Sequence, residues 1–109
     1  MTREVREPTF LLLTALAGGR RHGYALIEEV AALSGGEVEL RPGTLYAALD
    51  RLVTDGWVAV DGEEVVSGRL RRYFVLTDVG GAELEAHARR MQAAATTAIR
   101  RLRVRGATA

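Results

Sequence analysis

The feature that most constrains this chain is its C-terminal segment, which reads as one long helix. Thr77 and Asp78 give a helix N-cap signal, and the helix predicted from there to about Arg103 has roughly 27 residues and a length of about 40 Å. Apolar residues recur along it at alternating spacings of four and three, which is the spacing of a coiled-coil seam. The seam residues are Leu84, Ala88, Met91, Ala95, Ala98 and Leu102.

A helix of this length does not fit within a small domain. A compact body of about 100 residues is roughly 26 Å across, taking twice its radius of gyration, so a helix of about 40 Å overshoots it. The plainer alternative is that the helix only covers the core of its own domain. We favour a seam that packs on a partner helix, because the residues before it already predict three helices and a hairpin of their own.

The composition excludes several classes of protein. A chain of 109 residues favours one domain, and 48% hydrophobic with 27% charged residues is typical of a globular protein. The absence of cysteine rules out disulfides, zinc–thiolate sites and thiol catalysis. His22 and His87 show no metal-ligand spacing, and no glycine-rich phosphate loop or nucleophile elbow is present. We therefore expect no metal, no cofactor and no enzymatic activity.

No membrane signal is found in the sequence. The longest apolar run, residues 10–13, is far shorter than the roughly 20 residues that cross a bilayer. The chain does not open with the charged, apolar and small-residue segments of a signal peptide. The expectation is a cytoplasmic protein with no membrane partner.

Three helices are predicted ahead of the long one, each delimited by proline or glycine. They cover residues 7–17, about 24–33 and 42–56; Pro8 and Pro42 start the first and third, and glycines follow all three. The residues predicted to face the core are Phe10, Leu11, Leu13, Thr14, Leu16 and Ala17 in the first helix, Leu26, Ile27, Val30 and Leu33 in the second, and Leu45, Leu49 and Leu52 in the third.

A β-hairpin is predicted between the third helix and the last. Residues 57–60 (WVAV) and 71–76 (RRYFVL) read as strands, and the Asp-Gly and Ser-Gly turn signals between them predict a polar tip. The run VEL at residues 38–40 is too short to stand alone and is predicted, at most, as a small extra strand.

The order helix, short turn, helix, helix and basic-tipped hairpin is that of a winged helix-turn-helix. The predicted fold is α+β and mostly helical, with a winged helix-turn-helix domain over residues 1–76 and a long C-terminal dimerisation helix with a short tail over residues 77–109. In such a fold the third helix enters a DNA major groove, and the hairpin, called the wing, reaches an adjacent groove or the backbone. The element order therefore predicts DNA binding.

The third helix carries residues that packing alone does not require. Arg41, Gly43 and Thr44 stand at its N-terminus, where free N–H groups and the helix dipole favour a phosphate. Thr44, Ala47 and Arg51 share one face, and small Ala47 lets that face approach DNA closely. From this face Arg51 can reach a base edge or a phosphate.

Other interpretations of these charged and aromatic residues stay open. Arg51 can instead pair with Asp55 one turn on, and Tyr46 can simply pack between helix and hairpin. The wing arginines are Arg69, Arg71 and Arg72. They can be an ordinary solvated cluster, because Glu63 and Glu64 weaken their potential. Those acids and a net charge of +1 support a rival function, a winged helix that binds only other proteins.

Three segments together resemble the PadR family of bacterial transcriptional regulators. They are HGYALIEEV (residues 22–30), RPGTLYAALDRLVTDGWV (41–58) and SGRLRRYFVLTDVGGAEL (67–84). The resemblance implies a winged-helix domain with a C-terminal dimerisation helix, and a homodimeric repressor that binds a palindromic operator in double-stranded DNA. In many members it implies release by a small aromatic or cationic compound. The short chain resembles the subgroup with a single C-terminal helix.

The resemblance also assigns residues. It implies that Tyr24, Thr44 and Tyr46 contact the DNA backbone or a groove, and that Arg69 and Arg71 are wing contacts.

This sequence departs from the family pattern in places that affect rigidity and ligand binding. Ala47 stands where the family often has proline, which changes the stiffness of the helix more than its contacts. Gly81 adds a second glycine to the first turns of the last helix, costs about 1 kcal/mol relative to alanine and predicts a hinged arm. The last helix has no tryptophan or tyrosine to sandwich a flat ligand, although Met91 offers a soft apolar surface.

Overall fold

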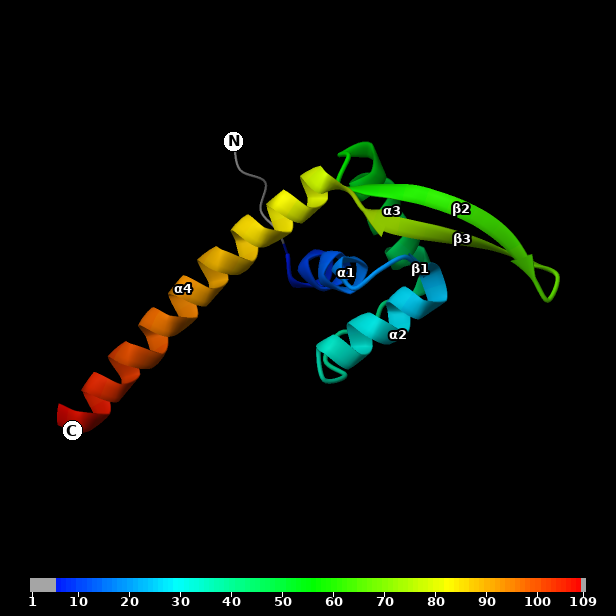
Figure 1. Ribbon diagram of the computed structural model, residues 1–109. Helices are drawn as coiled ribbons and strands as arrows, with labels where there is room; N and C mark the ends of the chain where they lie inside the picture. The colour runs from blue at the N-terminus through cyan, green and yellow to red at the C-terminus, as the bar shows by residue number, and fades with distance from the viewer. Residues whose placement is uncertain (1–5, 109) are drawn as a thin grey trace.

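The computed structural model describes residues 6–108 as a small body from which a wing and a long helix extend (Figure 1). The elements in chain order are α1 (Glu7–Ala17), β1 (Arg21–His22), α2 (Gly23–Leu33), α3 (Pro42–Thr54), β2 (Val58–Val66), β3 (Arg69–Leu76) and α4 (Asp78–Thr108). The predicted α+β, mostly helical winged fold is confirmed. The division at residues 76 and 77 stays a prediction, and residues 1–5 and 109 of those two segments lie outside the described residues.

The core lies where α1, α2 and α3 meet the base of the wing. Its fully buried side chains include Leu12, Leu13, Leu26, Leu45 and Leu49. The predicted stripe of α3 is confirmed, because Leu45, Leu49 and Leu52 are all buried. Burial of each such leucine contributes about 1.5–3 kcal/mol relative to an exposed position.

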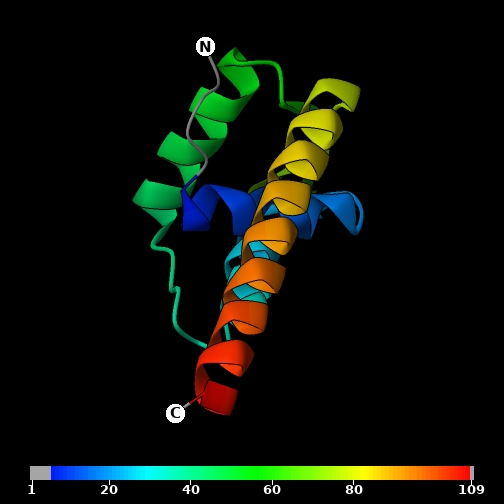
Figure 2. The same cartoon turned by 90° about the vertical axis from the view of Figure 1, so that its left-hand side faces the viewer.

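The predicted core stripe of α1 is partly wrong. Leu12 and Ala15 are buried although they were not assigned to the core, whereas Ala17 is exposed at the helix end. The reason is tertiary, since α2, β3 and α4 all pack on α1, and Figure 2 shows α4 crossing it. A helix covered from several sides has no single apolar stripe. In α2, Leu33 is likewise 43% exposed, because it is the last residue of the helix.

The extra strand does not lie at residues 38–40. The sheet has the order β1-β3-β2, and its short edge strand β1 pairs Arg21 with Phe74 and His22 with Tyr73. Residues 38–40 form no strand, and Leu40 instead anchors the α2–α3 connection by its burial. The strand of two residues exists because β3 supplies its hydrogen-bonding partner.

The wing is longer than predicted and has a single tight turn. Ser67 and Gly68 make that turn with positive φ angles of 52° and 77°, as a two-residue hairpin requires. Gly62, with φ of 95°, lies instead at an irregularity in the β2–β3 register. The tip is not purely polar, because Val65 and Leu70 face each other across it and are both exposed.

The long helix α4 is fixed to the body only at its start. The Thr77 hydroxyl donates a hydrogen bond to Gly56 O (2.6 Å) and accepts one from Gly80 N–H (3.0 Å), which confirms the predicted cap. Gly80 has no room for a side chain, since a Cβ there would overlap the backbone of Trp57. The helix runs without interruption through Gly81, and the hinge stays a prediction.

Beyond its first turns α4 leaves the body, on the side opposite the wing (Figure 1). The described chain is 64 Å in its longest dimension against 31 and 21 Å in the other two, so the predicted overshoot is confirmed. Among residues 6–108, no helix has the length and apolarity needed to span a membrane.

Candidate nucleic-acid interface

The N-terminus of α3 is open to an external partner. Arg41 is the N-cap residue and Pro42 begins the helix, but no side chain caps its first N–H groups. A Cβ added at Gly43 would meet nothing within 4 Å, so no contact inside the chain requires glycine there. Uncapped N–H groups at a helix N-terminus attract an anion. The geometry therefore suits the phosphate contact predicted for this end.

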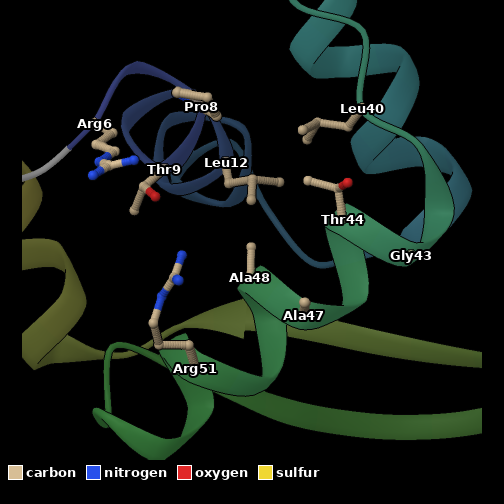
Figure 3. Close-up of a pocket in the computed structure, with 10 residues that line it drawn as sticks. All are labelled: Arg6, Pro8, Thr9, Leu12, Leu40, Gly43, Thr44, Ala47, Ala48 and Arg51. Atoms are coloured by element: carbon tan, nitrogen blue, oxygen red, sulfur yellow. The ribbon is translucent and has the colours of Figure 1, made fainter.

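The predicted reading face of α3 is exposed as a unit. Thr44, Ala47 and Arg51 are all exposed, whereas the leucines on the opposite side of the helix are buried. In Figure 3 the Arg51 side chain extends toward Arg6 and Thr9 at the start of α1. The roles of these three residues in DNA contact stay predictions.

Two tyrosines stand where α2 meets α3. Tyr24 is 68% exposed, so packing within the chain does not account for it. Tyr46 is 45% exposed, and its ring lies so close to Gly23 that a Cβ there would overlap the phenol. Tyr46 therefore packs at the helix junction and still presents a surface to solvent, and its role in DNA contact stays a prediction. The Gly23–Tyr46 contact also explains why glycine opens α2.

A cleft of about 350 Å³ brings the predicted contacts from three elements together. The residues that line it include His22, Tyr24, Tyr46, Arg69, Arg71 and Arg72. They come from the start of α2, from α3 and from the wing. Phenol hydroxyls and guanidinium groups are all hydrogen-bond donors to phosphate oxygens.

The acids of the wing are engaged by neighbouring side chains. Glu63 pairs with Arg72 Nε at 3.0 Å, and Glu64 accepts a hydrogen bond of 2.5 Å from the Tyr73 hydroxyl. Within residues 6–108, no ion pair occupies Arg69 or Arg71. Arg72 therefore serves the wing itself, whereas Arg69 and Arg71 stay available for a partner.

The base of the wing is held by a second polar group. The Arg20 guanidinium lies 3.8 Å from the centre of the Tyr73 ring, and its Nε is 3.2 Å from a carboxylate oxygen of Asp61. This contact joins the α1–β1 connection to both wing strands. No local sequence pattern predicts this contact, because its three residues are far apart along the chain.

His22 caps α2 beside the same cleft. Its Nδ1 accepts a hydrogen bond from Ala25 N–H at 3.4 Å, and its ring meets the Tyr73 ring edge-on at 5.6 Å. Burial lowers the pKa of His22, the charge of Arg71 lowers it further, and Glu28 and Glu64 act in the opposite sense. His22 thus acts as a neutral cap of α2.

The predicted seam of α4 divides into two parts. Leu84 packs against the core and Ala88 is half-buried. Its remaining residues are exposed: Met91, Ala95, Ala98 and Leu102. Ile99, 52% exposed, lies one helical turn after Ala95 and extends this apolar face; the same spacing could have identified it. Phe10, His87 and Met91 also line a groove of about 500 Å³ between α1 and α4.

Comparisons with known proteins agree with this geometry. Residues 12–86 match the family described as "Transcriptional regulator PadR-like family". The chain is 37% identical over 81 residues to transcriptional regulator Rv3488 of Mycobacterium tuberculosis, covering 74% of this chain and 72% of that protein.

Solved structures show the same fold. A PadR family transcription regulator from Clostridium difficile superposes with a TM-score of 0.70 at 24% identity, covering 84% of this chain and 94% of that one. Bacillus subtilis PadR, solved in complex with operator DNA, superposes with a TM-score of 0.67 at 20% identity. The superposition covers 76% of this chain and 48% of that one. With a family match over more than two thirds of its length, the chain belongs to the PadR-like family of transcriptional regulators.

Proposed function

We propose that this regulator is a homodimeric repressor that inserts α3 into the major groove and grips the flanking backbone with the cleft between α2, α3 and the wing. The cleft is the observation that carries the proposal. It assembles Tyr24, Tyr46, Arg69 and Arg71 from segments that are far apart in the sequence. Packing within the chain does not explain why two arginines and a largely exposed tyrosine should meet there.

Each part of this surface has a distinct role in the proposal. Thr44, Ala47 and Arg51 face the base edges or the phosphates beside them, while Arg41 and the bare backbone at Gly43 approach a phosphate. The arginines of the cleft supply most of the charge, so affinity falls steeply with salt. The rival interpretation as a module that binds only proteins loses part of its support, because Glu63 is paired with Arg72 within the wing, although Glu64 keeps its charge.

The second copy is proposed to pack on the exposed apolar face of α4. Ile99 and Leu102 present this face mostly exposed, and Met91, beside α1, is 46% exposed. A twofold dimer places its two recognition helices in successive major grooves, with half-sites about 10 bp apart, and so binds a palindromic operator. A small effector would release the dimer from DNA, and the regulator would act in the cytoplasm, where that DNA is.

The test is a gel shift with the DNA upstream of its own gene, repeated over a salt series. Arg69→Ala should weaken binding by about three- to fivefold and lower the salt slope by about one, since it removes one phosphate contact. Arg51→Ala should weaken it at least as much. Arg90→Ala, on the exposed side of α4, is the matched control for lost charge. If Arg51 and Arg69 variants bind like the control, the assigned surface is wrong.

A further inference from the structure

A second pocket lies on the other side of α3, between that helix and the start of α1 (Figure 3). Its volume of about 480 Å³ lies within the range of small-molecule sites, roughly 300–1,000 Å³. The lining residues are Arg6, Pro8, Thr9, Leu12, Leu40, Gly43, Thr44, Ala47, Ala48 and Arg51. Neither the cleft at the wing nor the proposed dimer face includes this pocket.

The charge in this pocket is of one sign. Among residues 6–108, Arg6 and Arg51 are its only charged lining residues, and Figure 3 shows both at the same end, with Leu40 and Thr44 at the other. Within residues 6–108, neither guanidinium group forms an ion pair. The hydroxyl of Thr9 lies at the cationic end. This end therefore suits a carboxylate or a phosphate group, which guanidinium groups bind through charge-assisted hydrogen bonds.

The rest of the pocket is apolar, which excludes a bare inorganic ion as the best occupant. Its accessible apolar wall consists of the exposed Pro8 and Ala47 and the half-buried Ala48, with the buried Leu12 and Leu40 behind them. A phosphate of the DNA backbone would use the two arginines but would leave this apolar surface in water. An apolar body attached to the anion would cover it.

We propose that this pocket binds an organic anion, with its charged group between Arg6 and Arg51 and its apolar body against Pro8, Ala47 and Ala48. Four lining residues, Gly43, Thr44, Ala47 and Arg51, belong to the proposed reading face of α3. An occupant would hold Arg51 toward α1 and cover this face, so it would compete with DNA. The competition rests on the proposed function, whereas the binding itself does not.

Binding is tested first without DNA, by calorimetry on the full chain with sodium octanoate as the probe. Octanoate should bind saturably. The control 1-octanol should bind about five- to tenfold more weakly because it has no charge, and inorganic phosphate should bind at least about tenfold more weakly because it has no apolar body. Arg6→Gln should weaken octanoate about three- to fivefold, and Arg90→Gln should leave it unchanged. Ala48→Phe should abolish binding by filling the pocket.

Three results would overturn the proposal: no saturable octanoate binding, binding that both Arg6→Gln and Ala48→Phe leave unchanged, or phosphate binding as tight as octanoate. The last would indicate a plain oxyanion site for the DNA backbone. Arg6 is exposed and its replacement keeps the fold, so Arg6→Gln decides the matter if Ala48→Phe fails to fold.

Competition is then measured by gel shift with increasing octanoate. The apparent Kd for DNA should rise in inverse proportion to the fraction of pockets left empty, and Arg6→Gln should require correspondingly more octanoate. If octanoate binds but leaves the apparent Kd for DNA unchanged, the proposed competition is wrong. A protein that binds octanoate but no DNA at all would instead refute the proposed function and leave the pocket assignment standing.

Discussion

The helices α3 and α4 are both amphipathic, but only α3 has its apolar side covered. Leu45 and Leu49 of α3 are fully buried, whereas Ile99 and Leu102 of α4 are 52% and 62% exposed. Apart from Tyr46 and Val53, the exposed side chains of α3 are polar or small, which suits a polar partner such as DNA. The exposed part of α4 carries an apolar face beside its arginines, and this face suits another protein surface. The exposed faces of the two helices therefore predict different kinds of partner, which are DNA for α3 and a protein surface for α4.

The largest effect expected from this comparison is on folding. Leu49→Ala removes a fully buried side chain from α3 and should lower the free energy of unfolding by about 2–5 kcal/mol, measured by urea titration. The matched control is Leu102→Ala, the same truncation at an exposed position, which should leave the unfolding of the dilute chain nearly unchanged. If both variants lost the same free energy of unfolding, the proposed difference between a covered apolar side in α3 and an uncovered one in α4 would be wrong.

The next effect is on association. If the outer face of α4 packs on a second copy, burying Leu102 contributes about 1.5–3 kcal/mol, so Leu102→Ala should raise the dimer dissociation constant at least about tenfold. Sedimentation equilibrium measures this, and Arg90→Ala is the control for a substitution on the same helix. A wild-type chain that stays monomeric at all concentrations would show that this face has a different partner.

Local sequence periodicity was sufficient to predict the principal elements. Leu45, Leu49 and Leu52 set the buried side of α3, and its proline and glycine set its ends. The missed strand β1 has only two residues and no period, because it exists through pairing with β3. The burial of Leu12 and Ala15 was missed for a similar reason, since it depends on the elements that cover α1.

The candidate site was predictable only in part. The resemblance to a family supplied Tyr24, Tyr46, Arg69 and Arg71 as residues, but their meeting in one cleft depends on how α2 and the wing pack. Arg6 was not predicted at all, because nothing near it in the sequence indicates that it faces Arg51 across a pocket.

A smaller effect separates stability from function within α3. Gly43→Ala adds a methyl group that meets nothing and should stabilise the helix by up to about 1 kcal/mol, while weakening DNA binding because the backbone is no longer bare. Gly81→Ala is the matched control in α4, where a Cβ also fits; it should give a similar gain with no loss of DNA binding. Urea titration and gel shift measure the two quantities. Unchanged DNA binding by Gly43→Ala would remove the phosphate contact from the proposal.

The smallest expected effect is on the pH dependence of stability at the start of α2. His22 caps this helix, whereas the start of α3 has no side-chain cap. The His22 Nδ1 accepts the Ala25 N–H, and a protonated ring would lose that acceptor. Burial, with Arg71, lowers the pKa of His22 in the folded protein. The unfolded chain then binds more protons, so this contribution to stability is fully present above the unfolded pKa of about 6.5 and is lost as the pH falls toward the folded value.

Replacing His22 with a cap that does not titrate isolates this effect. His22→Asn keeps a side-chain acceptor, so its free energy of unfolding should fall less than that of the wild type between about pH 7.5 and about pH 5.5. Every other ionisable group is the same in both proteins, so the difference between them isolates His22. Identical pH dependence would show that the stability of α2 does not rely on a neutral His22.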